Sequence, residues 1–88
     1  MGSGKRIIPA RLGEKLKAIR EALGLTTEEM VAKLDCPSIP LYRASITQFE
    51  KGRREPQLII LLKYARLAGT SVDVLIDNDL NLPQMSNN

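Results

Sequence analysis

Apolar residues recur at helical spacing over most of the chain. From Pro9 onward, a first set follows spacings of four and three: Leu12, Leu16, Ile19 and Leu23. Gly24 follows directly, and glycine is the residue that most often ends a helix. The pattern predicts one amphipathic helix that buries a single face.

A second helix is predicted after a short turn. Thr26 stands three positions before Glu29, the spacing of a capping box in which a hydroxyl and a carboxylate each accept a backbone N–H. Met30, Val31 and Leu34 then form the expected buried face.

The next stretch, Asp35 to Tyr42, contains two prolines and no clean period, which indicates an extended connection. Beyond it, Ile46 and Phe49 are apolar and three residues apart, and Gly52 ends the predicted third helix. Arg43, Ala44, Thr47 and Gln48 lie off this apolar stripe and are expected to face outward.

Two further helices complete the pattern. Residues 57–68 form a strongly apolar helical segment closed by Gly69, and Ser71 is placed to cap a short helix that carries Val72, Leu75 and Ile76. No strand pattern is visible. The expected fold is all-α, a compact bundle of four to five short helices.

Length and composition narrow the organisation. Eighty-eight residues suit one small domain. We expect residues 1–8 to be a flexible arm, with MGSG as a remnant of cloning, residues 9–79 to form the domain, and residues 80–88 to be a frayed tail. The longest apolar run, residues 58–62, is far too short to span a membrane and is followed at once by Lys63.

Candidate catalytic chemistry is sparse. One cysteine and no histidine exclude a disulfide framework and argue against a zinc site, and they fit a reducing cytoplasm. The chain has no glycine-rich phosphate loop and no carboxylate cluster with metal-ligand spacing. No neighbour in the sequence marks Cys36 as nucleophilic or redox-sensing, so we expect an inert thiol. We expect neither an enzyme nor a bound cofactor or metal.

Charge alternates in blocks along the chain. Residues 5–20 carry a net charge of +5 and residues 36–66 carry +4, whereas residues 21–35 and 67–88 carry −3 each. If folding brings the two basic blocks together, the molecule has one basic side.

Three segments in order carry a family resemblance: LGEKLKAIREALGLTTEEMVAKL, SITQFEKGRREP and LLKYARLAGTSVDVLI. Together they resemble the phage-repressor/Cro-type (XRE-like) helix-turn-helix domain of bacterial transcription regulators, over roughly residues 9–77. The resemblance implies a lambda-repressor-like fold, binding to double-stranded DNA and a place at the bacterial nucleoid in the cytoplasm. It also implies a recognition helix at about residues 43–51 in the major groove.

The resemblance assigns roles residue by residue, counted from the glutamate and glycine of EKG. The implied base-reading set is Arg43, Ala44 and Gln48, with Ser45 and Thr47 beside them. The chemistry agrees, because arginine pairs with guanine, glutamine with adenine, and an alanine methyl group can touch thymine. An ordinary solvated helix face is the alternative interpretation of these residues.

Phosphate contacts are expected on either side of the recognition helix. Thr27 lies at a helix start, where backbone N–H groups favour an anion. Lys51, Arg53 and Arg54 fill the next loop, for which a solvated charge run is the alternative. The resemblance further implies a structural ion pair between Arg20 and Glu50.

The sequence departs from the family between the second and third helices. Six residues separate Leu34 from Leu41 where the family usually has one, an insertion of about five that replaces the tight turn. Val31 stands where a small residue is usual, and Tyr42 where a Ser or Thr cap is usual. Toward DNA, the insertion could add phosphate contacts from Ser38 and Tyr42; turned away, it could bind another protein.

The segment 57–68 carries a second apolar stripe. Leu58, Leu61, Leu62 and Ala65 suffice to cover a core, and the remaining stripe consists of Ile60, Tyr64 and Leu67. A small domain has little capacity to bury both. We therefore expect a homodimer through this second stripe and the 72–76 segment; coverage by the C-terminal tail is the alternative.

Two functions remain open at this point. One is a sequence-specific, dimeric DNA-binding transcription regulator that occupies a promoter. The other is a protein-interaction module, an antitoxin or adaptor, that uses the fourth helix and the 35–42 insertion.

Overall fold

The computed structural model describes residues 7–84. These residues form five α-helices and no strand: α1 Leu12–Ala22, α2 Thr27–Leu34, α3 Arg43–Glu50, α4 Leu58–Leu67 and α5 Val72–Ile76. The predicted all-α class is therefore confirmed. Most of the expected N-terminal arm lies outside the described residues.

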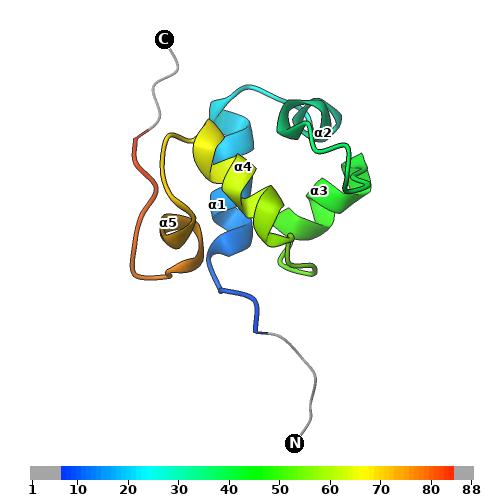
Figure 1. The fold of residues 1–88 in the computed structure, drawn as a ribbon. Helices are drawn as coiled ribbons and strands as arrows, with labels where there is room; N and C mark the ends of the chain where they lie inside the picture. The colour runs from blue at the N-terminus through cyan, green and yellow to red at the C-terminus, as the bar shows by residue number, and fades with distance from the viewer. Residues whose placement is uncertain (1–6, 85–88) are drawn as a thin grey trace, which may run out of the picture.

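The helices pack around α1 and α4, which lie next to each other in the middle of the molecule (Figure 1). α2 and α3 lie on one side of this pair, and α5 lies on the other. One core joins all five helices. Apart from Ala68, which is 8% exposed, its side chains are at most 3% exposed; they are Leu12, Leu16, Ile19, Met30, Leu34, Ile46, Phe49, Ile60, Leu61, Tyr64, Ala65 and Leu75.

The helix boundaries follow local chemistry. The hydroxyl of Thr26 accepts the N–H of Glu29 at 3.1 Å, and the Glu29 carboxylate accepts the N–H of Thr26 at 2.8 Å, so the predicted capping box is present. Gly24 and Gly52 adopt φ of +73° and +72° after α1 and α3, in the left-handed region that glycine enters without strain.

The prediction for the fourth helix is wrong in its assignment of faces. Ile60 and Tyr64, expected at a dimer interface, are 0% exposed, and Leu58, expected in the core, is 76% exposed. The reason is that α4 contacts α1, α2 and α5 together, so that most of its circumference is buried within one chain. Leu67 is half-buried against the core.

The beginning of the expected C-terminal tail is hydrogen-bonded to the folded domain. The guanidinium of Arg11 donates to the carbonyl of Asn78 at 2.8 Å and to the side-chain oxygen of Asn81 at 2.9 Å. Leu82 packs against the core. Residues 78–82 thus belong to the folded body rather than to a frayed end.

Candidate nucleic-acid interface

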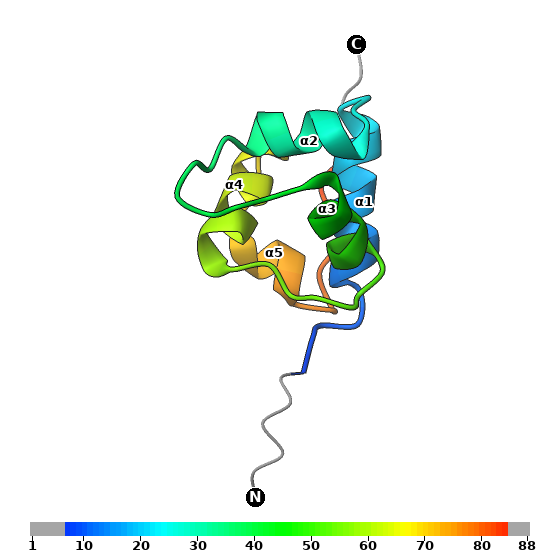
Figure 2. The same cartoon turned by 90° about the vertical axis from the view of Figure 1, so that its right-hand side faces the viewer.

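α3 is held against the body of the protein by its apolar face. Ile46 and Phe49 are 0% and 3% exposed, as their spacing predicted. α3 lies beside α2 at the surface seen face-on in Figure 2, and the 35–42 connection runs between the two helices on that side. The opposite face of α3 is therefore left open.

The C-terminal end of α3 is fixed by a close approach to α1. A Cβ atom at Gly13 would lie 2.5 Å from the carbonyl oxygen of Glu50 and 3.0 Å from that of Phe49. Only glycine leaves room for this backbone contact. The sequence pattern gave no sign of this role, because Gly13 lies inside a predicted helix, where glycine is ordinarily unfavourable.

Arg20 and Glu50 form the ion pair that the family resemblance implied. Nε of Arg20 donates to Glu50 Oε2 at 2.6 Å, and a second guanidinium nitrogen donates to Oε1 at 3.0 Å. A third bond, at 2.9 Å, reaches the carbonyl of Leu25 in the turn before α2. The hydrogen bonds to Glu50 raise the pKa of Arg20. One side chain thus connects α1, the α1–α2 turn and the end of α3.

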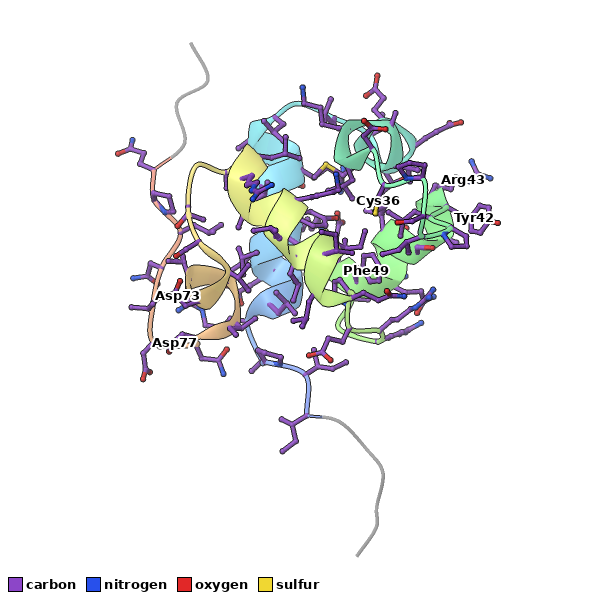
Figure 3. All side chains as sticks on the ribbon, viewed as in Figure 1. Cys36, Tyr42, Arg43, Phe49, Asp73 and Asp77 are labelled. Carbon is purple, nitrogen blue, oxygen red and sulfur yellow. The ribbon has the colours of Figure 1, made fainter. Side chains whose placement is uncertain are left out.

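The outward face of α3 carries the predicted base-reading residues, with one exception. Arg43 and Ala44 are exposed, and Thr47 and Gln48 are half-buried on the same side of the helix. Figure 3 shows the side chain of Arg43 extending away from the body at the N-terminal end of α3. Within residues 7–84 its guanidinium makes no hydrogen bond or ion pair.

Ser45 is the exception, because it is buried and cannot reach a base. Its side chain is only 5% exposed, and its hydroxyl accepts the N–H of Tyr42 at 3.2 Å. This bond caps the N-terminus of α3 at Tyr42, three residues before Ser45. The cap explains why the hydroxyl faces inward. The placement of Ser45 among the base-reading residues is therefore wrong.

The predicted phosphate-contacting residues border α3. Thr27 is the first residue of α2 and is half-buried. Lys51, Arg53 and Arg54 are exposed in the loop after α3. The guanidinium of Arg54 lies 5.8 Å from the centre of the Phe49 ring, close enough for a cation–π contact that limits the range of its side chain.

Tyr42 lies at the junction of the connection and α3. Its side chain is 67% exposed and projects beside Arg43 (Figure 3). A groove of about 440 Å³ runs from these two residues along α2, where Val31, Ala32 and Leu41 line it. The 35–42 connection therefore adds surface next to α3.

One cation of the first basic block, Lys15, is turned into the protein and adds nothing to a basic surface. Lys15 is 2% exposed, and its ammonium donates to the carbonyls of Val74, Asp77 and Leu80 at 2.7, 2.9 and 2.8 Å. Desolvation, followed by the neighbouring Arg11 cation, lowers the pKa of Lys15. Sequence reasoning missed this residue, because a lysine inside an amphipathic helix is usually on its solvated face.

Two aspartates of the C-terminal acidic block lie away from α3. Figure 3 shows Asp73 and Asp77 on the side of the molecule opposite Tyr42 and Arg43. The cations in and after α3 therefore face solvent on a side from which these carboxylates are remote, an arrangement that favours a polyanion at α3.

Other kinds of site are not found in the part of the chain that the structure describes. In residues 7–84 no three His, Cys, Asp or Glu side chains are placed to hold a metal ion together. None of the helices there has the length and apolar character needed to cross a membrane. Cys36 is a free, half-buried thiol in the connection.

Comparison with known proteins agrees with this geometry. No match is found among curated proteins. A family model described as a helix-turn-helix domain matches residues 11–77, from the residue before α1 to the residue after α5. The match covers α2, the connection and α3, the three parts that form the motif, and extends over most of the chain. The chain is thus a member of the helix-turn-helix domain family.

Proposed function

We propose that the protein is a transcription regulator that binds specific sequences of double-stranded DNA, with α3 in the major groove. The observation that carries the proposal is the division of α3 into two faces. Ile46 and Phe49 fix one face in the core, and the other presents Arg43 and Gln48 to solvent. These two side chains suit the major-groove edges of guanine and adenine.

Phosphate contacts on both sides of α3 set its depth and register. The N-terminus of α2 at Thr27 offers backbone N–H groups to one strand. Lys51, Arg53 and Arg54 face the other strand from the loop after α3, and Tyr42 adds a hydroxyl at the start of the helix. Such contacts position a protein on DNA but carry no sequence information.

A homodimer is part of the proposal, but its interface on α4 is formed by other residues than the sequence pattern predicted. Since Ile60 and Tyr64 are buried, the apolar residues of α4 that remain open to a second copy are Leu58 and Ile59, which are 76% and 42% exposed. They follow the basic loop after Gln57, so that a two-fold axis beside them would bring the two basic loops close together. Light scattering at tens of micromolar that gives the monomer mass would contradict this arrangement.

The proposed site of action is the bacterial nucleoid, where such a dimer would occupy a promoter. The mechanism needs no bound cofactor, metal or catalytic group, because occupancy of the operator alone excludes other proteins from it.

The first test is selection of bound duplexes from a random pool. We expect enrichment of a palindrome whose half-sites are about one helical turn, roughly 34 Å, apart. Arg43→Ala and Gln48→Ala should then each lose about 1 to 3 kcal/mol of discrimination at one base pair. Arg54→Ala is the matched control, since loss of a phosphate contact weakens binding to every sequence alike. Equal losses on all duplexes for the three variants would contradict base reading by α3.

The alternative is a protein-interaction module, an antitoxin or adaptor, and one observation favours it. The groove along α2 and the adjoining hollow lined by Cys36, Pro37 and Ile39 lie beside the connection and share the apolar residues Val31, Ala32 and Leu41. Salt separates the two functions. DNA affinity falls steeply as salt rises because bound counterions are released, whereas an apolar protein contact is nearly insensitive to salt. Absence of any enriched duplex would favour this alternative.

A further inference from the structure

The hydroxyl groups of α3 are turned toward its own backbone. Oγ1 of Thr47 donates to the carbonyl of Arg43 at 3.2 Å, one helical turn earlier. The hydroxyl of Ser45 accepts the N–H of Tyr42 and is buried. The hydroxyl of Thr47 cannot donate to a base without breaking its bond to the carbonyl of Arg43, and the hydroxyl of Ser45 is too deeply buried to reach one.

Methyl groups remain on the outward surface. The Cβ of threonine carries one hydroxyl and one methyl group, and the hydroxyl of Thr47 is directed to the helix backbone. The methyl group of Ala44, three residues earlier and on the same face, is exposed. Ala44 and Thr47 therefore form a small apolar strip, which lies between the longer polar side chains of Arg43 and Gln48.

We propose that this apolar strip recognises the 5-methyl group of thymine, so that the bound site contains thymine beside the base pairs read by Arg43 and Gln48. The inference rests on the proposed function and makes it more specific. Among the four bases, thymine alone places a methyl group in the major groove, and alanine and threonine methyl groups contact it through apolar surface. The other three bases lack this methyl group, so each of them loses the apolar contact at this position.

The test removes one methyl group at a time from either partner. Each thymine of the selected duplex is replaced singly by deoxyuridine, which differs only by the methyl group. Dissociation constants are measured by fluorescence anisotropy for the wild-type protein and for Thr47→Ser. Serine deletes the methyl group but keeps the hydroxyl that bonds to the carbonyl of Arg43.

Thr70→Ser is the matched control, because it deletes the same methyl group in the turn between α4 and α5, outside the proposed DNA interface. For the wild type we expect about fourfold weaker binding when one particular thymine becomes uracil, the change that corresponds to burial of one carbon. Thr47→Ser should bind the two duplexes nearly equally, whereas Thr70→Ser should retain the fourfold ratio.

Two results would overturn the inference: a wild-type protein indifferent to uracil at every thymine, or a Thr47→Ser variant that keeps the full ratio. These results are distinguishable from failure of the proposed function. If DNA binding is insensitive to salt and no sequence is enriched, the function itself fails. If a sequence is enriched and discriminated but uracil is bound as well as thymine, only the methyl recognition fails.

Discussion

Two groups of cationic side chains in this protein have the same residue types but differ in whether they bond to other groups of the protein. Arg11, Lys15 and Arg20 of the α1 region all donate to groups of the protein itself. Arg43, Lys51 and Arg53, in and after α3, have no such partners within residues 7–84. Segment charge alone does not distinguish the groups, since both lie in basic blocks of the sequence.

The difference lies in what each helix meets. α1 is central, so its cations reach other elements: Lys15 and Arg11 donate to carbonyls of the chain after α5, and Arg20 donates to the carboxylate of Glu50 at the end of α3. α3 is peripheral, and nothing in the described chain covers its outward side. A cation next to a helix C-terminus neutralises its exposed carbonyls, whereas an unpaired cation at the surface is available to an external anion.

The largest expected effect is the loss of Arg20. Its side chain is 15% exposed and that of Glu50 is 8% exposed, so Arg20→Met leaves a buried carboxylate without its partner. We expect the free energy of unfolding to fall by about 3 kcal/mol. Urea unfolding followed by circular dichroism measures this change. Lys17→Met is the control, because Lys17 is an exposed cation of the same helix, and it should change stability by less than about 0.5 kcal/mol.

The loss of Lys15 should come next. Lys15→Met removes the hydrogen bonds to the carbonyls of Val74, Asp77 and Leu80. The Asp77 carbonyl keeps the N–H of Leu80 as a donor, and the Leu80 carbonyl keeps the Arg11 guanidinium. Because the two later residues are exposed and water can reach them, we expect a loss of about 2 kcal/mol rather than the sum of all three bonds. DNA affinity of the folded fraction should be unchanged. A variant as stable as the wild type, or one with selectively weaker DNA binding, would contradict an internal, structural role for Lys15.

Arg53 tests the external group. Arg53→Ala should leave the urea midpoint unchanged and reduce the slope of log affinity against log salt by about 0.9, the value for one phosphate on duplex DNA. Affinities measured between 50 and 200 mM salt, conditions where the slope is steep, give the comparison directly. If the slope stays the same, Arg53 does not face a phosphate.

The smallest effect at neutral pH is expected at Tyr64, beside the Arg20–Glu50 pair. Its hydroxyl is buried, and no hydrogen-bond partner for it exists among the described residues, so Tyr64→Phe should be neutral or stabilising by less than about 1 kcal/mol. Unfolding at pH 7 measures this difference.

Alkaline pH should separate Tyr64 from Lys15. Burial, followed by the Glu50 charge, raises the pKa of Tyr64 above its ordinary value of 10.0, so the native state keeps a proton that the unfolded chain loses, and stability falls above that pH. Burial lowers the pKa of Lys15 below 10.5, so this residue contributes stability that increases as pH rises toward 10.5. Tyr64→Phe should remove the alkaline decline; a decline that persists would assign it to another group.

Prediction from sequence succeeded where a helix depends on its own neighbours. The capping box at Thr26, the glycine ends and the outward position of Arg43 all follow from residues within one or two turns. The apolar stripes of α1 and α3 were also predictable, since each of these helices buries one face. The roles of Arg20 and Glu50 came from the family resemblance, because spacing alone cannot pair residues thirty positions apart.

The faces of α4 were not predictable in the same way. A helix that is apolar on several sides has no single apolar stripe to identify its buried face. Which side chains are buried then depends on the other helices that pack against it. Ser45 was misplaced for a related reason, since a hydroxyl at a helix start can turn inward to the backbone as readily as outward.

The sequence by itself determined an all-α bundle of four to five short helices, the glycine stops after three of them, and a polar outward face on α3, because helix periodicity and capping are local. Tertiary structure alone decided which cations are internal, that a side chain at position 13 would collide with α3, and which face of α4 packs against other helices. These outcomes depend on contacts between segments far apart in the chain. The energetic balance of such contacts involves desolvation and packing against a particular partner, which no single segment encodes.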